Sequence, residues 1–248
     1  MPSSPSTTLA IPARLASTRL PRKVLLDLGG RPVLQHVWER ARRAKLASAV
    51  VILADSDEVA GVARGFGADV LMTDPACPNG TFRLASVLDK LPGDFFINVQ
   101  GDEPFISPDL IDALAARHAQ TGCGLVTAVS RLTDPARLAA DSVVKVVRAE
   151  SGEALYFSRS PIPHLRGVPM SEWTARRPYW GHLGIYGYDR ATLAAYPTLA
   201  ATELEACESL EQLRFVAHGY RFQTVETDYH PVAIDTASDL EHARSLVR

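Results

Sequence analysis

The sequence contains little cysteine and no pair of cysteines at a metal-binding spacing. Its three cysteines, Cys77, Cys123 and Cys207, are odd in number and far apart, with no C-x-x-C pair. This spacing argues against a disulfide framework and against a structural zinc site. A chain of 248 residues is long enough to bury a sizeable core without either of them.

The sequence also lacks a long hydrophobic run and an excess of charge of one sign. The longest solid apolar run, Ala49–Ala54, is too short to span a membrane, and the first residues, MPSSPSTT, lack the pattern of a signal peptide. The formal net charge is −2, which argues against nucleic acid and acidic membranes as partners. We therefore expect a cytoplasmic protein whose anion sites are local concentrations of charge.

Several motifs of large enzyme classes are absent as well. No G-x-x-x-x-G-K-[ST] loop, G-x-S-x-G elbow or H-E-x-x-H pair occurs. The segment GFGADV (65–70) begins like a dinucleotide fingerprint but lacks its third glycine and precedes a strand-like run, so a nicotinamide enzyme is not expected. The seven histidines are scattered and are expected to be structural, except that His182 in HLGIYGY is kept as a candidate.

Short apolar runs alternate with longer helical patterns in the first half of the chain. The expected strands are Leu9–Pro12, Ala49–Ala54, Asp69–Met72, Phe95–Val99 and Leu125–Val129. The expected helices between them are Pro32–Lys45, Glu58–Phe66, Phe82–Leu91 and Pro108–Ala119. Solidly apolar strands separated by helices predict an α/β fold, with a mainly parallel central sheet and helices on both faces.

The pattern changes after Pro135. Three strands with fewer helices between them are expected at Val143–Val147, Ala154–Phe157 and Gly184–Tyr188, and the four prolines of Pro161–Pro178 indicate a long irregular loop. The last part predicts a helix, a strand and a closing helix, at Glu203–Ala217, Phe222–Thr227 and Thr236–Val247. We infer one domain, residues 1–248, with an antiparallel lobe inserted at about 135–190.

Polar clusters follow three of the expected strands, where ligands bind in open α/β sheets. The basic residues of IPARLASTRLPRK (11–23) follow the first strand, Asp55 follows the second, and QGDE (100–103) follows FFINV. Arginine forks and a lysine suit the oxygens of a nucleoside triphosphate, which brings about four negative charges. The chain supplies four cations there: Arg14, Arg19, Arg22 and Lys23.

Two aspartates are candidates for a metal site. Polyphosphates are handled with hard divalent cations that prefer oxygen ligands, and Asp102 offers one after the FFINV strand. Asp235 stands before the closing helix and could complete a two-carboxylate site. Its spacing alone favours another role, the N-cap of that helix, because Thr236 and Asp239 also fit a helix start.

At these residues the sequence resembles a known family. The blocks IPARLASTRLPRK, NVQGDEP, VVKVV…ALYFSRSPIP, HLGIYGY, LEQLR and IDTASDLE together resemble the 3-deoxy-manno-octulosonate (Kdo) cytidylyltransferases, also called CMP-Kdo synthetases. The blocks stand in family order from about residue 9 to residue 244. The resemblance implies a Rossmann-like nucleotide-diphospho-sugar transferase fold and a homodimer.

The resemblance also implies a reaction and its residues. The family joins CTP and Kdo to give CMP-Kdo, for lipopolysaccharide synthesis, and pyrophosphate, with Mg²⁺ required; the sugar 2-hydroxyl attacks the α-phosphate. By motif, the resemblance implies that Asp102 and Asp235 bind Mg²⁺. It implies that Arg14, Arg19 and Lys23 bind the triphosphate. The resemblance implies that the cytidine is bound by the backbone around Ala13, by Asn79, Gly80 and Thr81, and by Gln100. The residues implied for the sugar acid are Arg159, His182, Tyr186, Glu211 and Gln212.

The chain departs from the family pattern at three places. Phe82 stands where the family often has an acid, and Arg22 where a glycine is common. A frequent Gly-Val-Asp-Thr-Pro has become AIDTA (233–237), which keeps the aspartate. None of these changes removes an implied metal ligand. Phe82 and the divergent loop Pro163–Pro178 leave room for an altered sugar specificity.

Three other functions stay open. A cytidylyltransferase for another acidic sugar, such as 8-amino-Kdo or a neuraminate, is the nearest; the neuraminate enzymes usually continue the shared opening with Gly-Ser-Lys, where this chain has Ala16, Ser17 and Thr18. A metal-dependent glycosyltransferase would carry an Asp-x-Asp-type pair, which Asp102–Glu103–Pro104 imitates poorly. A non-catalytic sugar-nucleotide-binding module could have lost Lys23 or a metal aspartate, and both are kept.

Overall fold

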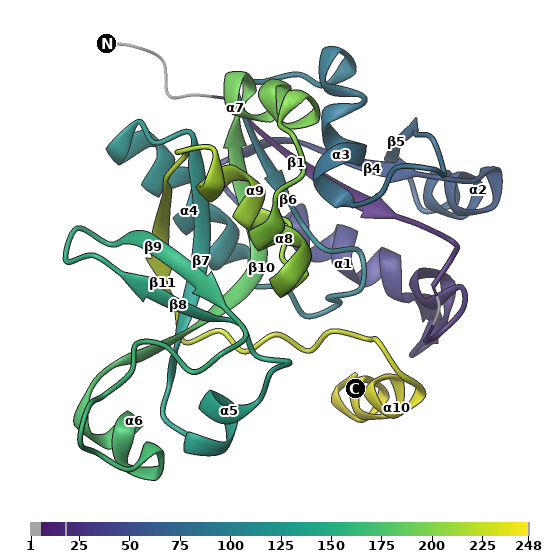
Figure 1. The fold of residues 1–248 in the computed structure, drawn as a ribbon. Helices are drawn as coiled ribbons and strands as arrows, with labels where there is room; N and C mark the ends of the chain where they lie inside the picture. Colours follow the sequence, from purple (N-terminus) through teal and green to yellow (C-terminus); the bar gives the residue numbers. More distant parts are fainter. Residues whose placement is uncertain (1–5, 18, 248) are drawn as a thin grey trace.

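A computed structural model describes residues 6–17 and 19–247. Its centre is a nine-stranded mixed sheet in the order β5-β4-β1-β6-β10-β7-β11-β9-β8 (Figure 1). Beside it lies a two-stranded sheet formed by β2 and β3. The strands are β1 (Thr7–Ala13), β2 (Asp27–Leu28), β3 (Arg31–Pro32), β4 (Ala47–Ala54), β5 (Asp69–Met72), β6 (Phe95–Asn98), β7 (Leu125–Leu132), β8 (Lys145–Arg148), β9 (Glu153–Ser158), β10 (Tyr179–Asp189) and β11 (Phe222–Glu226).

The first half of the chain forms the parallel part of the sheet. β1 lies between β4 and β6 and runs parallel to both, and β5 continues the parallel order beyond β4. β10 interrupts this order because it runs antiparallel to β6 on one side and to β7 on the other. The expected α/β fold is therefore confirmed. The sheet is continuously parallel over β5, β4, β1 and β6, and it is mixed as a whole because one long strand from the later part of the chain, β10, crosses its middle.

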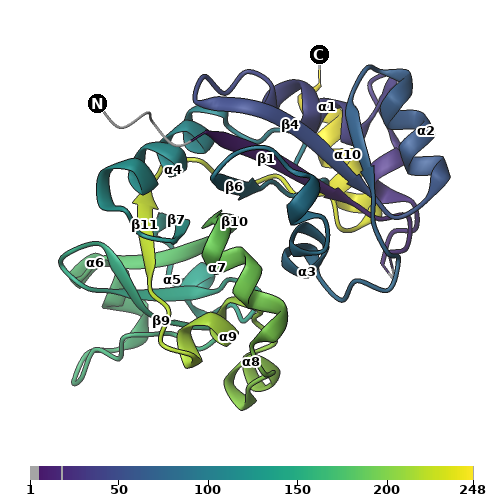
Figure 2. The same cartoon turned by 90° about the horizontal axis from the view of Figure 1, so that it is seen from above.

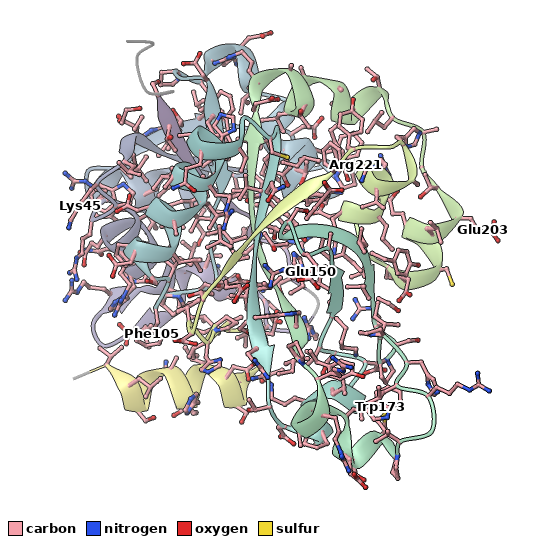
Figure 3. All side chains as sticks on the ribbon, turned by 90° about the vertical axis from the view of Figure 1, so that its left-hand side faces the viewer. Lys45, Phe105, Glu150, Trp173, Glu203 and Arg221 are labelled. Carbon is pink, nitrogen blue, oxygen red and sulfur yellow. The ribbon has the colours of Figure 1, made fainter. Side chains whose placement is uncertain are left out.

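The helices cover both faces of the sheet. In Figure 3, Lys45, which follows α1, and Glu203, which begins α8, lie on opposite sides of the strands. The helices are α1 (Val33–Ala41), α2 (Asp57–Gly65), α3 (Gly80–Ala85), α4 (Pro108–Thr121), α5 (Pro135–Ala139), α6 (Trp173–Arg176), α7 (Arg190–Ala195), α8 (Glu203–Glu208), α9 (Gln212–Ala217) and α10 (Ala237–Leu246). Short 3₁₀ helices occur at Lys23–Leu25, Leu88–Lys90, Met170–Glu172 and Tyr196–Thr198.

Successive side chains of a strand point to opposite faces of the sheet and so pack into two separate hydrophobic cores. Leu9 and Ile11 of β1 face one core, where α1, α2 and α4 pack, whereas Ala10 faces the other, with α3, α7 and α9. All three side chains are fully buried. Burying a leucine or isoleucine side chain stabilises a fold by roughly 1.5–3 kcal/mol. Two-sided burial is the reason that the strand reads as an unbroken apolar run.

Two sequence expectations need correction. The helix expected at Glu203–Ala217 is broken into α8 and α9, because Ser209 takes a left-handed conformation (φ 51°) that ends α8. The helix expected at Phe82–Leu91 is also shorter, with α3 followed by a separate 3₁₀ turn. The segment Pro161–Pro178 is largely irregular as expected, apart from the short turns around α6.

The later strands give the predicted antiparallel character to one end of the sheet. β8 and β9 pair antiparallel, and β8 also meets β10. Figure 2 shows β9 and β11 with α8 and α9 on the side of the molecule away from α1, α2 and α10. The division of the chain into one domain with an inserted lobe stays a prediction.

The C-terminal helix α10 returns to the beginning of the chain. Leu240 and Ala243 of α10 pack with Leu28 and Val33 in a small separate core that also holds Ile234. Figure 2 shows α10 beside α1. This packing places the segment before α10 beside the loop that follows β1. None of the helices in the described part of the chain is long and apolar enough to cross a membrane.

Candidate functional site

A pocket of about 270 Å³, here called the first pocket, opens where β1 and β6 end. The carboxyl ends of parallel strands are where the sequence placed its charged clusters. Of the candidate residues, those that line this pocket are Arg14, Lys23, Asn79, Gly80, Gln100, Asp102 and Glu211. Segments far apart in the sequence thus contribute to one pocket.

Lys23 is the centre of a cluster of charges beside the first pocket. Its ammonium donates to Oδ2 of Asp102 and to Oδ1 of Asp235, the latter at 2.9 Å. Arg19 is largely exposed and reaches the other oxygen of Asp235, Oδ2, at 3.0 Å. Burial lowers the pKa of Lys23, but the two carboxylates outweigh that effect and leave the pKa raised. Lys23 is therefore a fixed positive charge at any physiological pH.

Asp235 reaches Lys23 because it does not cap α10. The N-cap is Thr236, which forms a capping box with Asp239, so the N-cap role expected for Asp235 from its spacing was wrong. The backbone N–H of the preceding Ile234 donates to the carbonyl of Asp102 at 2.9 Å. This bond holds the two aspartate segments together and leaves the Asp235 carboxylate free to meet a cation.

The arrangement fits a divalent cation between two carboxylates. Asp102 and Asp235 already converge on one positive group, the ammonium of Lys23. No cluster of three or more His, Cys, Asp or Glu side chains with metal-binding geometry exists within residues 6–17 and 19–247. The chain thus offers two oxygen ligands, which is typical of Mg²⁺ sites that take their other ligands from phosphates and water.

Arg22 occupies a backbone position that favours glycine. Its φ of 59° and ψ of 22° lie in the left-handed region, which costs a residue with a Cβ about 1 kcal/mol. This explains why a glycine is common here in the family that the sequence resembles. The guanidinium forms an ion pair with Glu58.

The loop after β1 is fixed by Asp55. Both carboxylate oxygens of Asp55 accept the backbone N–H of Leu15, at 3.0 and 3.1 Å. The sequence allowed two interpretations of Asp55, as a ligand-binding residue or as part of an ordinary loop. This contact supports the second, because it holds the loop backbone. It holds the segment that carries Arg14, whose exposed side chain makes no hydrogen bond or ion pair within the described residues.

The NGT turn shapes the opposite wall of the first pocket. Asn79 caps α3 through Oδ1, which accepts the N–H of Phe82 at 2.8 Å, and its Nδ2 donates to the hydroxyl of Tyr196. Gly80 lies so close to the core that a Cβ would sit 3.0 Å from Nδ2 of Asn98. Thr81 and Ala13 are buried behind the lining rather than in it.

Glu211 is a buried acid at the first pocket. Burial raises its pKa to about 7. Thr81 donates to Oε1 at 3.3 Å, whereas the buried Oε2 has no hydrogen-bond partner within the described residues. The sequence grouped Glu211 with the sugar-acid residues, and the structure places it on the wall shared with Asn79 and Gly80. Its free oxygen can accept a hydrogen bond from a ligand there.

A second pocket, of about 350 Å³, lies beside β10 and contains three other sugar-acid candidates: His182, Tyr186 and Gln212. The hydroxyl of Tyr186 donates to Oε1 of Gln212 at 3.3 Å. Gln212 is buried, and its Nε2 has no partner within the described residues. The second pocket therefore offers an amide donor that is held in place and ready for a ligand.

Gln100 connects the two pockets. Its side chain lines the first pocket, and its Nε2 donates to the carbonyl of Gly184 at 3.1 Å. Gly184 itself lines the second pocket. The pockets are thus neighbours, with the strand β10 between them.

Arg159 lines neither pocket. Its guanidinium donates to three backbone carbonyls, those of Asp141 (3.0 Å), Glu208 (2.7 Å) and Ser209 (3.4 Å). An arginine has five N–H groups, so two remain for a ligand. The role implied for Arg159, binding a carboxylate, stays a prediction.

Comparison with known proteins assigns the family. The family model described as "Cytidylyltransferase" matches residues 8–224. The 3-deoxy-manno-octulosonate cytidylyltransferase of Geobacter metallireducens is 42% identical over 244 residues, which are 94% of each chain. That of Myxococcus xanthus is 40% identical and covers 98% of this chain and 96% of its own. This chain belongs to the Kdo cytidylyltransferase family.

Solved structures agree with this assignment. A CMP:2-keto-3-deoxy-manno-octonic acid synthetase, complexed with CTP, is 37% identical and superposes with a TM-score of 0.91 over 97% of this chain and 98% of its own. A glucose-1-phosphate thymidylyltransferase from Bacillus anthracis, 17% identical with a TM-score of 0.67, covers 98% of this chain and 96% of its own, and shares the fold. The expected family and its Rossmann-like nucleotidyltransferase fold are confirmed.

Phe82, where the family often has an acid, takes part in packing outside the first pocket. Its ring centroid lies 4.9 Å from that of Tyr196, and the guanidinium of Arg214 lies 5.3 Å from it. Arg214 in turn forms two hydrogen bonds with Glu205, at 2.7 and 2.8 Å. The aromatic ring therefore joins α3 to α9, and Phe82 is not part of the pocket lining.

Sequence reasoning missed several residues at the second pocket. Ser130 and Arg137 line it, but neither stands in a pattern that marks it. Lys145 is fully buried, and its ammonium donates to the carbonyls of Ala140, Val143 and Arg159. The sequence signal that could have identified Lys145 was its place as a lone lysine inside the apolar block VVKVV. Lys145 holds together the backbone that borders the second pocket.

Proposed function

We propose that this protein transfers CMP from CTP to Kdo and releases CMP-Kdo and pyrophosphate. The observation that carries the proposal is the pairing of Lys23 with Asp102 and Asp235 beside the first pocket, next to a second pocket lined by His182, Tyr186 and Gln212. The names of the relatives support it, as does the CTP complex of the solved synthetase.

In this proposal the first pocket takes CTP. Arg14, Arg19 and Lys23 neutralise the triphosphate, since guanidinium and ammonium groups bind phosphate oxygens. The cytidine lies against the turn Asn79–Thr81 and Gln100, with the free oxygen of Glu211 available as an acceptor. We assign the backbone at Ala13 to the same subsite, as the end of β1.

Asp102 and Asp235 would hold Mg²⁺. When bound, the ion lowers the pKa of the attacking hydroxyl and reduces the repulsion between two anionic substrates. Lys23 then has phosphate oxygens as partners in addition to the carboxylates. We place no third protein ligand on the ion.

The reaction needs positioning and charge neutralisation rather than a covalent enzyme intermediate. The sugar 2-hydroxyl oxygen forms a bond to the α-phosphorus, the bond from that phosphorus to the α–β bridging oxygen breaks, and pyrophosphate leaves. The hydroxyl proton passes to solvent. The residues named above hold the two substrates in line and keep their charges balanced.

The second pocket takes the sugar acid. His182, Tyr186 and Gln212 would contact its hydroxyl groups. Arg159 lines neither pocket, so its two remaining N–H groups would bind the carboxylate only where the ligand extends beyond the second pocket. Glu211, at the wall of the first pocket, would lie between the two ligands. Gln100, which links the pockets, would fix the position of one substrate relative to the other.

We further propose a homodimer that acts in the cytoplasm, supplies activated Kdo for lipopolysaccharide synthesis and has no nucleic acid as a partner. The antiparallel strands β8 and β9 are the candidate subunit interface, because they end the sheet. Sedimentation of the purified protein tests the oligomeric state.

The deciding experiment is pyrophosphate release from CTP with Mg²⁺. Kdo, 8-amino-Kdo and N-acetylneuraminate are offered in parallel, with UTP as the nucleotide control. Release with Kdo and CTP alone is the expected result. A preference for another acid would keep the chemistry and replace the substrate, and no release from a folded, CTP-binding protein would favour a binding module.

A further inference from the structure

Strand β10 carries a two-residue bulge between the two pockets. Leu183 pairs with Ala128 and Tyr186 pairs with Thr127, so Gly184 and Ile185 have no partner on β7. Bulges of this kind redirect side chains and occur next to active sites. This bulge carries the carbonyl that accepts from Gln100, and one residue, Leu183, separates it from His182.

Thr127 fixes the bulge from the neighbouring strand. Its fully buried hydroxyl lies 2.8 Å from the carbonyl oxygen of Ile185 and 3.4 Å from that of Leu183. The same hydroxyl lies 2.9 Å from Nε2 of His182. One side chain thus contacts the bulge and the imidazole ring of the second pocket.

The number of protons decides the direction of these bonds. A threonine hydroxyl has one proton to donate and two lone pairs. A carbonyl oxygen only accepts, so the short contact to Ile185 uses the hydroxyl proton. Nε2 of His182 must then carry a proton and donate it to the hydroxyl, because two acceptors without a proton between them do not attract each other.

We propose that Thr127 sets the tautomer of His182, so that the ring carries its proton on Nε2 and presents Nδ1 to the second pocket as a hydrogen-bond acceptor. Thr127 is then a positioning residue, since it acts through the ring. Nδ1 makes no hydrogen bond within residues 6–17 and 19–247, and the ring lines the second pocket. A neutral acceptor of this kind binds a hydroxyl group and repels a carboxylate.

The surroundings of the ring agree with a neutral imidazole. Its neighbours are aromatic, with the centroids of Phe157 and Tyr186 at 5.1 and 5.3 Å. Burial lowers the pKa of His182 to about 3, so the ring has no charge at neutral pH. With Gln212, the second pocket therefore offers one acceptor and one donor at fixed places, a pair suited to the hydroxyl groups of a sugar.

The tautomer can be measured without any substrate. In protein labelled with ¹⁵N-histidine, the protonated and bare ring nitrogens have well-separated shifts, and His182→Gln identifies the signal among the seven histidines. We expect the Nε2–H form in the wild type and a mixture of tautomers in Thr127→Val, with Thr127→Ser like the wild type. The Nδ1–H form in the wild type, or an unchanged signal in Thr127→Val, would overturn the proposal.

A kinetic comparison tests the consequence for the sugar, which rests on the proposed function. Thr127→Val should raise KM for the sugar acid about 3- to 10-fold, as expected for one lost hydrogen bond, and leave KM for CTP unchanged. Thr127→Ser, which keeps the hydroxyl, should have the wild-type KM for the sugar acid. An equal rise in both constants, or no rescue by serine, would mean a merely structural role. If Kdo is not the substrate, the spectroscopic result still stands, so the two failures are distinguishable.

Discussion

The two pockets hold their functional groups in opposite ways. Beside the first pocket, charges are paired with one another: Lys23 with Asp102 and Asp235, and Arg19 with Asp235. In the second pocket, neutral groups are held by hydrogen bonds, with His182 on Thr127 and Tyr186 on Gln212. The first is formed at the ends of parallel strands and the second along the antiparallel strand β10.

The two basic side chains make the difference plain. Carboxylates raise the pKa of Lys23 in spite of its burial, whereas burial without a charged partner lowers the pKa of His182 to about 3. The first pocket thus keeps full charges for an anionic ligand, and the second keeps a fixed pattern of donors and acceptors. Under the proposed function, charge would set the strength of binding in the first pocket, and geometry would set the choice of sugar in the second.

The largest effect is expected from Asp102, the carboxylate that we propose as a metal ligand. Asp102→Asn should lower the Mg²⁺-dependent turnover by about 10³-fold, because the contribution of a metal to transition-state stabilisation is several kcal/mol. Steady-state pyrophosphate release measures it. The matched control is Asp89→Asn, at an exposed position. Retained activity in Asp102→Asn would place the metal site elsewhere.

Removing the central cation should have the next effect. Lys23→Met keeps the stem and loses the charge, so that CTP binding and turnover should fall about 10- to 100-fold, as expected for a hydrogen bond to a charged group. Isothermal titration with CTP measures the binding. Lys90→Met, at an exposed lysine, should change nothing. An unchanged rate for Lys23→Met contradicts the assigned role.

Glu211 allows a test through stability. The pKa of Glu211 is raised from 4.5 to about 7 in the folded protein. The folded state therefore holds the proton up to a higher pH than the unfolded state, and the free energy of unfolding falls as the pH rises from 4.5 through 7. Glu211→Gln cannot ionise. It should therefore gain on the order of 2 kcal/mol over the wild type between pH 4 and pH 8, measured by urea unfolding.

The control for this titration is the exposed Glu150. Glu150→Gln should show the same difference from the wild type at both pH values. A gain in Glu211→Gln that does not depend on pH would mean that folding leaves the pKa of this carboxyl group unchanged, which would contradict the raised pKa.

The smallest effect is expected in the second pocket. Tyr186→Phe frees the amide of Gln212 and should raise KM for the sugar acid about 3- to 10-fold, with KM for CTP unchanged. Tyr188→Phe is the matched variant, since that hydroxyl contacts Thr81 on the side of the first pocket. If both variants changed the same constant, the distinction between the pockets would fail.

Much of the fold was predictable because its signals are local. Alternating apolar strands and amphipathic helices predicted the parallel sheet, and β1, β4, β5 and β6 lie where the pattern placed them. The break at Ser209 was not predictable, because the periodicity of Glu203–Ala217 continues across it. A left-handed residue other than glycine leaves no mark in the pattern.

By itself the sequence determined the charged loop after β1, the acid after β6 and the family motifs that connect them. Only the tertiary structure decided which of these groups meet. Asp235 lies 212 residues from Lys23 and reaches it because α10 packs against the beginning of the chain. Thr127 meets His182 across two strands paired with a bulge. Both contacts depend on how distant segments pack together, and no local spacing in the chain encodes them.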